Sequence, residues 1–320
     1  MFFRKKSILL TVTIMLLVLV SVLLLVVVWN INDESVLEVQ PSQTLVLSVN
    51  ETTRTLLPST ATATSSPTPA PTTTAAPTPT ITATPEIPQG AAVVIGYSVA
   101  GRPLEVYRFG SGETRQMIIA GIHGGYESNT VELADQLITY LQENPDTVPA
   151  DRTLYILRLM NPDGFAREFG VNGRANENGV DLNRNWDANW QAEWPRAYCW
   201  NSLPISAGTA AMSEPETQAV AKFVQEQAVS SIISFHSAGP GIYAGGQPDG
   251  PRSTSLAKTL SGANGYPYLD GPSLCVYTGM MADWAVTQGI PAVDVELPDH
   301  ANPDFKMNLK ALQAFLSWKQ

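Results

Sequence analysis

Apolar and polar residues follow different patterns along the chain: an apolar run near the N-terminus, a polar middle rich in proline, and a long C-terminal part with scattered short apolar runs. In this C-terminal part the apolar runs are bounded by turn-forming residues, which is typical of buried β-strands. The predicted strands are 92–95, 104–109, 117–122, 154–159, 232–235 and 293–297.

Helical periodicity fills several intervals between these strands. From 131 to 141, apolar residues return every third or fourth position, as one face of a helix requires, and Ser128 or Asn129 is placed to cap the N-terminus. Further helices are predicted at 255–260, 279–287 and 305–318.

Another helix is predicted to begin in the segment "SEPETQAVAKFV". Ser213 and Glu216 have the spacing of a capping box, and Pro215 suits a first helical turn. Strands that alternate with helices predict an α/β fold, in which a largely parallel or mixed sheet lies between layers of helices. Ligands in such folds bind near the carboxyl ends of the strands, so functional residues are expected there.

The apolar run at 8–29 contains no charged residue and is long enough to cross a bilayer as a helix. The basic segment 1–7 precedes it and acidic residues follow, so the positive-inside tendency predicts a cytoplasmic N-terminus with the rest of the chain outside the cell. Bulky residues continue to the end of the run, which favours an uncleaved signal-anchor over a cleaved signal peptide. We therefore expect a single-pass protein of the cell membrane whose C-terminal part is extracellular.

Residues 30–90 are expected to be a linker. Within it, 58–90 consists almost wholly of Pro, Thr, Ala and Ser, a composition that cannot form a core and predicts a disordered stalk. Such a stalk would hold a domain away from the membrane surface. The remaining segment, 91–320, has the size of one α/β domain.

The overall charge is acidic, with 29 Asp and Glu residues against 19 Lys and Arg residues. This excess argues against nucleic acid as a partner. The chain has two cysteines, Cys199 and Cys275, both in the part expected to be exported. A disulfide persists in that environment, but the sequence leaves open whether they pair or remain two buried thiols.

Two of the three histidines, His123 and His236, follow predicted buried strands. An imidazole there must be hydrogen-bonded or must coordinate a metal. In the segment "GIHGGYESNT", the glycines after His123 allow a tight turn, so that Glu127 can approach the same ion. Two histidines and one carboxylate, with an open fourth position, are the ligands of a recurrent catalytic zinc site. Taken alone, this short string is weak evidence for a metal site, and a structural histidine with a surface glutamate is its more common explanation.

Several further motifs follow in order: "MNPDGF" at 160–165, "GR" at 173–174, "GVDLNRNWD" at 179–187, "SEPET" at 213–217, "SFHSAG" at 234–239 and "VELPD" at 295–299. With this order and spacing, 91–320 resembles the zinc carboxypeptidases of the carboxypeptidase A type. The resemblance implies an α/β fold with a mixed, mostly parallel sheet of about eight strands flanked by helices. It also implies one zinc ion held by His123, Glu127 and His236.

The resemblance implies roles for other residues as well. Glu296 matches the family's general base, and Arg174 matches the arginine that polarises the scissile carbonyl. Asn183 and Arg184 match the pair that binds the terminal carboxylate of the substrate, a task that suits a planar guanidinium. The turn sequence "NPDG" at 161–164 is given no catalytic role. His300, in a polar loop flanked by prolines, is expected to be solvated.

The chain departs from the family pattern at several points. The family commonly has two residues between its first histidine and the glutamate, whereas Gly124, Gly125 and Tyr126 separate His123 from Glu127. A flexible loop can absorb the extra residue, so Glu127 remains the expected ligand.

The substrate side of the site departs as well. Tyr277 lies at about the place of a tyrosine that closes over substrate, although the segment after it is shorter than usual. Met280, Met281 and Ala282 suggest an apolar specificity pocket, whereas a shift of one residue would place Asp283 there and favour an amine-bearing side chain.

The main functional hypothesis is therefore a membrane-tethered extracellular zinc metallocarboxypeptidase. Its substrate would be a peptide with a free C-terminal carboxylate, with cell-wall muropeptides as one candidate. Since 30–90 lacks the apolar periodicity of a folded inhibitory segment, the enzyme is expected to be constitutively competent. The alternatives are a zinc-dependent amidase or deacylase acting on a non-peptide acyl amide, and a catalytically inactive domain that binds peptide ends.

Overall fold

A computed structural model describes most of the C-terminal part of the chain. The predicted cytoplasmic end at 1–7, membrane segment at 8–29 and most of the linker and stalk lie outside the described residues. Within the described part, no helix is long and apolar enough to cross a membrane. The described residues are 87–167, 169–196, 199, 203–246, 250–270 and 275–319.

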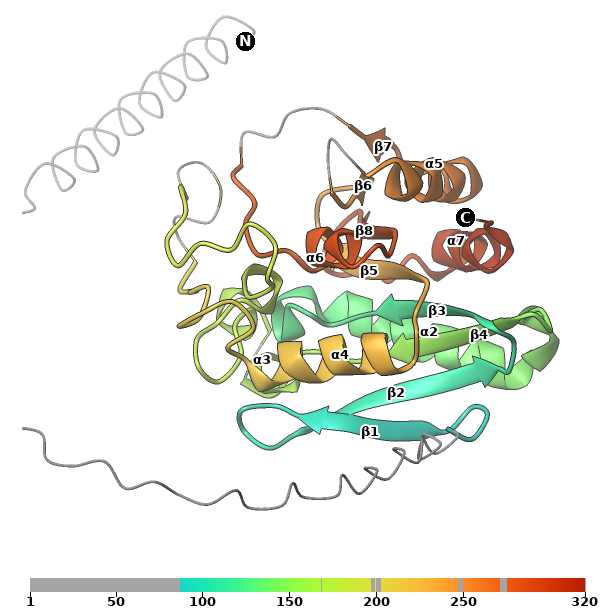
Figure 1. Cartoon of the computed structure of the whole chain (residues 1–320), viewed down its shortest axis with the longest axis horizontal. Coiled ribbons are helices and arrows are strands. Elements are labelled where there is room, and N and C mark those ends of the chain that lie inside the picture. The colour runs from blue at the N-terminus through green and yellow to red at the C-terminus, as the bar shows by residue number, and fades with distance from the viewer. Residues whose placement is uncertain are drawn as a thin grey trace, which may run out of the picture. The chain divides into compact units, whose positions relative to one another are not determined.

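Eight strands form one sheet with the order β1-β2-β4-β3-β5-β8-β6-β7 (Figure 1). Each of the six predicted strands is found, with shifts at the ends. The shorter β6 and β7 were not predicted. The strands are β1 (Ala92–Tyr97), β2 (Pro103–Gly110), β3 (Thr114–Ile119), β4 (Arg152–Leu157), β5 (Ser231–Ser237), β6 (Gly241–Ala244), β7 (Tyr268–Leu269) and β8 (Ala292–Leu297).

Parallel strands occupy the centre of the sheet. The pairs β4–β3, β3–β5 and β5–β8 are parallel, and so is the edge pair β6–β7. The pairs β1–β2, β2–β4 and β6–β8 are antiparallel. The predicted mixed, mostly parallel sheet is therefore confirmed, and the parallel centre brings the carboxyl ends of β3, β5 and β8 to one edge.

Helices cover both faces of the sheet. Side chains of a strand point alternately to its two faces, so neighbouring residues such as Ile118 and Ile119 belong to different cores. One core lies under α2, α5 and α7, and the other lies under α4 and α6. The helices are α2 (Ser128–Glu143), α3 (Pro162–Arg167), α4 (Pro215–Glu226), α5 (Pro251–Asn264), α6 (Met281–Thr287) and α7 (Phe305–Ser317).

The predicted caps of α2 and α4 are wrong. Helix α2 begins at Ser128 itself, and Asn129 donates hydrogen bonds to the carbonyl oxygens of Asp299 and Asn302. At α4 the Ser213 hydroxyl binds Glu214, and no side chain caps the helix. The side chains that local spacing assigned to capping therefore have other partners: Asp299 and Asn302 for Asn129, and the adjacent Glu214 and the distant Asn185 for Ser213.

Candidate metal centre and active site

The segment after β3 places His123 and Glu127 side by side. The strand ends at Ile119, earlier than predicted, and the 3-10 helix η1 (Gly124–Glu127) follows His123. Gly124 has φ +48, and a Cβ atom there would lie 2.7 Å from the carbonyl oxygen of Gly173. Only glycine fits this turn. The tight turn absorbs the extra residue, and Nδ1 of His123 lies 2.7 Å from Oε1 of Glu127.

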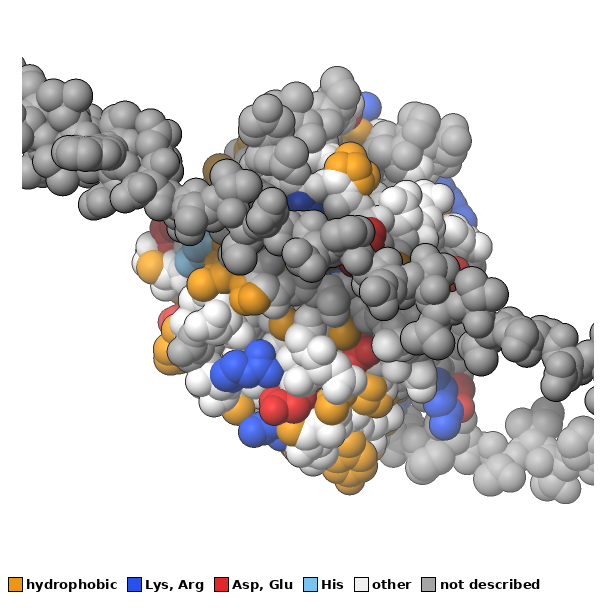
Figure 2. Space-filling model, turned by 90° about the vertical axis from the view of Figure 1, so that its left-hand side faces the viewer, with side chains coloured by type: hydrophobic (Ala, Val, Ile, Leu, Met, Phe, Trp, Pro, Cys, Tyr) orange, Lys and Arg blue, Asp and Glu red, His pale blue; other side chains and the backbone are white. Residues whose placement is uncertain are grey.

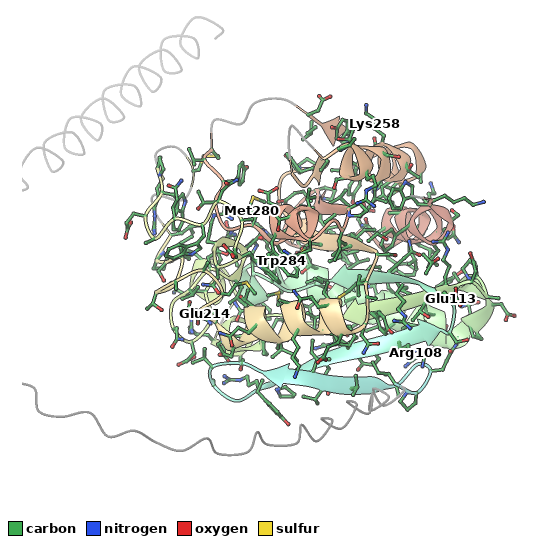
Figure 3. The ribbon with its side chains drawn as sticks, in the orientation of Figure 1. Arg108, Glu113, Glu214, Lys258, Met280 and Trp284 are labelled. Carbon is green, nitrogen blue, oxygen red and sulfur yellow. A yellow bond between two sulfur atoms is a disulfide. The ribbon has the colours of Figure 1, made fainter. Side chains whose placement is uncertain are left out.

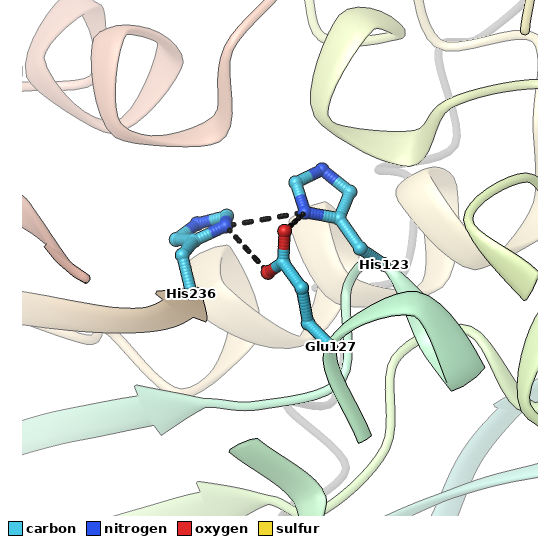
Figure 4. A group of neighbouring side chains, drawn as sticks. All are labelled: His123, Glu127 and His236. Atoms are coloured by element: carbon cyan, nitrogen blue, oxygen red, sulfur yellow. Dashed lines mark hydrogen bonds and ion pairs between the residues drawn. The ribbon is translucent and has the colours of Figure 1, made fainter. Parts of the chain in front are cut away.

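His236 completes a cluster with these two residues (Figure 4). It lies near the carboxyl end of β5, where its Nδ1 is 3.4 Å from Oε2 of Glu127 and 3.4 Å from Nδ1 of His123. The ligand atoms of the three residues all lie within 4.8 Å of one another, and all three side chains are buried. The structure thus brings together the three residues predicted as metal ligands.

The donor set of this cluster fits zinc. Ligands bound at about 2.0–2.1 Å in a tetrahedral arrangement lie about 3.3 Å apart, close to the separations between His236 and its two neighbours. Oε2 of Glu127 is buried without a hydrogen-bond donor in the described part of the chain, as expected of an atom reserved for a cation. Burial raises the pKa of Glu127, but the charge and hydrogen bond of His123, together with the charge of His236, outweigh it and lower this pKa below its usual range. Zinc is the protein's cofactor, and these residues supply one carboxylate and two imidazoles for it.

Asp181 contacts both His123 and Arg174, and it was not predicted from the sequence. Its Oδ1 lies 3.2 Å from Nε2 of His123, and its Oδ2 accepts a hydrogen bond from Nε of Arg174 at 2.8 Å. A carboxylate at this position fixes the ring orientation of a ligating histidine and raises its basicity. The signal was present in "GVDLNRNWD", where an acidic residue stands between apolar ones. For His236, the hydroxyl of Ser234 lies 2.9 Å from Nε2.

Arg174 is buried next to the cluster. Its guanidinium contacts Asp181 and also lies 3.4 Å from Oε1 of Glu127. Asn161 donates a hydrogen bond of 2.9 Å to the backbone carbonyl of Arg174, and its own side chain accepts one from the backbone of Gly164. The turn at 161–164 therefore does more than reverse the chain, because it holds the arginine in place.

Glu296 projects from β8 into the same pocket. Its strand register pairs it with His236 of β5, which explains why the two side chains meet at one edge of the sheet. Burial, together with the negative charges of Glu127 and Asp294, raises the pKa of Glu296 to about 8 against the opposing charges of His236 and Arg174.

Asn183 and Arg184 form another wall of the pocket. Both are buried in the 3-10 helix η4 (Leu182–Arg184), and Oδ1 of Asn183 accepts a hydrogen bond from the backbone of Met281. The Arg184 guanidinium lies 5.6 Å from the ring centre of Tyr277, which is 42% exposed at the mouth of the pocket. All predicted catalytic and substrate-binding residues thus border one cavity. Its lining residues are His123, Tyr126, Glu127, Arg174, Asn183, Arg184, His236, Ser237, Ala238, Tyr277, Met280, Asp294, Glu296 and His300.

The predicted specificity wall is only partly right. Met280 lines the pocket, but Met281 and Ala282 are buried in the core with Trp284, whose position near Met280 is labelled in Figure 3. The Asp283 carboxylate accepts a hydrogen bond of 2.7 Å from the backbone of Gly246 and does not line the pocket. Besides Glu127 and Glu296, the acidic residue that lines the pocket is Asp294, which was not predicted from the sequence.

His300 is exposed, as predicted, and it also lines the pocket. Its ring centre lies 4.8 Å from that of Tyr126, and its Nδ1 lies 3.0 Å from the hydroxyl of Ser237. On the face shown in Figure 2, hydrophobic side chains gather beside a histidine. The Tyr126 ring in turn lies 5.4 Å from the guanidinium carbon of Arg174.

Cys199 and Cys275 form a disulfide, which settles the question that the sequence left open. The bond spans 76 residues and joins the segment after η4 to the one that carries Tyr277 and Met280. It therefore ties the segment that carries Tyr277 and Met280, which line the pocket, to a part of the chain 76 residues earlier.

Comparison with protein families gives a match to the zinc carboxypeptidase family over residues 83–317. Among characterised proteins, murein peptide amidase A of Escherichia coli K12 is 29% identical over 235 residues, which cover 70% of this chain and 88% of that protein. Gamma-D-glutamyl-L-diamino acid endopeptidase 1 of Lysinibacillus sphaericus is 26% identical over 245 residues, covering 65% of this chain and 61% of that protein.

Solved structures show the same fold. The murein-tripeptide amidase of Escherichia coli O157 aligns with a TM-score of 0.55 and 24% identity, over 72% of this chain and 92% of that one. Bovine thrombin-activatable fibrinolysis inhibitor, solved with a tick carboxypeptidase inhibitor, aligns with a TM-score of 0.58 and 22% identity, over 71% of this chain and 89% of that one.

Proposed function

Since the chain belongs to the zinc carboxypeptidase family, we propose that it hydrolyses the C-terminal amide bond of peptides and that bacterial cell-wall muropeptides are among its substrates. The observation that carries this proposal is the convergence in one pocket of a His-Glu-His cluster, the carboxyl group of Glu296 and the guanidinium groups of Arg174 and Arg184. These are the groups that peptide-bond hydrolysis at a chain end requires.

Bound zinc supplies Lewis-acid chemistry, which activates water and polarises the scissile carbonyl. Glu296 takes a proton from the attacking water and later delivers it to the leaving amine. Arg174, fixed by Asp181 and by Asn161, offers a buried positive charge to the carbonyl oxygen as that oxygen becomes negative. A fixed donor of this kind typically contributes a few kcal/mol to the transition state, on the order of 2.7–4 kcal/mol.

Arg184 and Asn183 make this an exopeptidase site. A guanidinium presents two parallel N–H groups to a carboxylate, and a peptide has a free α-carboxylate only at its C-terminus. Both residues are buried at the wall of the pocket, and an internal peptide bond would bring no carboxylate to the guanidinium.

Two kinds of support favour muropeptides. Murein peptide amidase A and the diamino acid endopeptidase, both named for activity on amide bonds of murein or of diamino acids, match most of the described domain.

The sequence also suggests that the uncharged run 8–29 anchors the chain in the cell membrane and that the stalk at 58–90 carries the domain outside it. Protease added to intact cells should then release the domain; complete protection would contradict the external location.

One experiment tests the activity. The zinc-loaded full-length protein is incubated in detergent with a mixed library of peptides and muropeptides, and the released residues are identified by mass spectrometry. We expect loss of single C-terminal residues, and a Glu296→Gln variant should bind zinc but release nothing. Hydrolysis of acyl amides that lack a terminal carboxylate would favour the amidase or deacylase alternative, and binding without hydrolysis would favour an inactive peptide-end-binding domain.

A further inference from the structure

Asp294 is an acidic residue in the pocket that has no part in the mechanism above. It stands two positions before Glu296 on β8, so the two side chains point to the same face of the sheet. Asp294 is only 5% exposed, yet it lines the pocket together with Asn183, Arg184, Tyr277 and Met280. It therefore lies within the part of the cavity that the terminal residue of a substrate would occupy.

Oδ1 of the Asp294 carboxyl group is buried without a hydrogen-bond donor within the described part of the chain. Its one ion-pair contact joins Oδ1 to Nε2 of His236 at 3.4 Å, and that nitrogen has a closer partner in the hydroxyl of Ser234 at 2.9 Å. Leaving a buried carboxylate oxygen without a hydrogen-bond donor lowers the stability of the fold by roughly 1–3 kcal/mol or more. The missing donors are therefore expected to come from a ligand.

Asp283 provides the contrast. The sequence offered Asp283 as an alternative lining residue of the specificity pocket. Its carboxylate instead accepts a hydrogen bond from the backbone of Gly246, and the residue does not line the cavity. The acidic character that the sequence suggested for Asp283 of helix α6 is thus present in the pocket, but Asp294 of strand β8 supplies it.

We propose that Asp294 selects substrates whose terminal residue carries an amine on its side chain, a class that includes lysine, ornithine and diaminopimelate. This inference rests on the proposed carboxypeptidase function. An ammonium group has three donors and no acceptor, which matches a carboxylate that lacks donors. Arg184 binds the α-carboxylate of the same residue, and the apolar surfaces of Tyr277 and Met280 flank its methylene stem.

The test uses two peptides that differ only in the terminal residue, one ending in lysine and the other in norleucine. These side chains have the same apolar stem, so the ratio of their kcat/KM values measures recognition of the amine. We expect the zinc-loaded full-length protein to favour lysine by about tenfold to a hundredfold, the range of a hydrogen bond to a charged group. In Asp294→Asn this preference should largely disappear, mainly through a higher KM for the lysine peptide.

Asp283→Asn is the matched control, and it should retain the preference for lysine. Zinc content and thermal stability of each variant are measured alongside the kinetics. The proposal is overturned if Asp294→Asn slows both peptides equally and weakens zinc binding, since Asp294 would then only position His236. Equal hydrolysis of both peptides by the unchanged protein also overturns it while leaving the carboxypeptidase function intact. Release of neither residue overturns that function and this inference together.

Discussion

Asp181 and Arg174 form a buried ion pair, with 2.8 Å between Oδ2 of the carboxylate and Nε of the guanidinium. The other oxygen of Asp181 lies 3.2 Å from Nε2 of His123. Burial raises the pKa of Asp181, but Arg174 and His123 outweigh it and hold this pKa well below its usual range. One carboxylate therefore orients both a zinc ligand and the arginine assigned to the developing negative charge.

Asp181→Asn should weaken zinc binding and slow turnover together. An amide has the same shape but cannot hold His123 and Arg174 with a negative charge, and loss of such an outer partner typically lowers metal affinity by about 10–100-fold. The affinity is measured by competition for zinc with a chelator of known strength. Asp163→Asn is the control, because Asp163 is equally buried but binds Ser98 and Arg102 away from the metal. Unchanged zinc affinity in Asp181→Asn would contradict this role.

Tyr126, one of the three residues between His123 and Glu127, should affect catalysis through Arg174. Its ring lies 5.4 Å from the guanidinium carbon of Arg174, and its ring centre lies 4.8 Å from that of His300. Tyr126→Ala removes a cation–π contact that is typically worth about 0.5–2 kcal/mol, so we expect kcat to fall by about 2–30-fold. Tyr126→Phe keeps the ring and should stay close to the parent enzyme. Equal losses in both variants would show that the hydroxyl, and not the ring, matters.

Loss of the disulfide should destabilise the domain and loosen the pocket. A double variant, Cys199→Ser with Cys275→Ser, removes a cross-link over 76 residues, and native disulfides typically contribute about 2–4 kcal/mol to the free energy of unfolding. Because Cys275 stands two residues before Tyr277, we also expect a higher KM. Urea denaturation and peptide kinetics measure the two effects. A loss of stability with an unaltered KM would show that the disulfide does not influence substrate binding.

The metal ligands and the general base were predictable because each lies in a short motif, and the order of these motifs along the chain carries the family resemblance that assigned them. His123 and Glu127 lie within one short motif, and His236 and Glu296 each belong to an apolar strand that the hydrophobic pattern defines. The sheet was predictable for the same reason, except for β6 and β7, which are too short for a pattern to emerge.

The residues missed by the sequence analysis depend on distances across the fold. Asp181 matters because it contacts His123 and Arg174, and Asp294 matters because it lines the pocket. The spacing of residues along the chain does not predict these contacts. The capping box failed for a related reason. Glu216 accepts hydrogen bonds from the backbone of Val99 and from Asn176, partners that lie far away in the sequence.

The metal-free protein should lose stability as pH rises, in part because of Glu296. Its carboxyl has a pKa of about 8 in the fold against an ordinary value of 4.5, so between these values the folded state holds more protons than the unfolded state. The free energy of unfolding therefore falls as pH rises through this range. Glu296→Gln lacks this contribution, and its melting temperature should exceed that of the parent increasingly between about pH 5 and pH 8.

This pH dependence is followed by thermal melting of both proteins in the presence of a chelator. The difference between the two melting temperatures isolates the contribution of Glu296, because the other titrating groups are the same in both proteins. Adding zinc should reduce the difference, because a cation beside Glu296 favours its charged form. Parallel melting curves for the two metal-free proteins at all pH values would contradict the raised pKa of Glu296.

Arg184→Lys should selectively impair substrates that carry a free terminal carboxylate. A lysine keeps the positive charge but loses the planar pair of donors, so the carboxylate would be held by a single flexible contact. Arg184 is also 1% exposed and packed beside the rings of Tyr277 and Trp194, which leaves little room for an ammonium group and its water. We expect kcat/KM for a peptide acid to fall by roughly 10–100-fold, consistent with a charged hydrogen bond of about 1.5–3 kcal/mol.

The matched substrate is the same peptide with a C-terminal carboxamide, which should be cleaved slowly by both proteins. If the acid and the carboxamide were cleaved equally well by the parent enzyme, Arg184 would not read the chain end, and the amidase alternative would gain its strongest support.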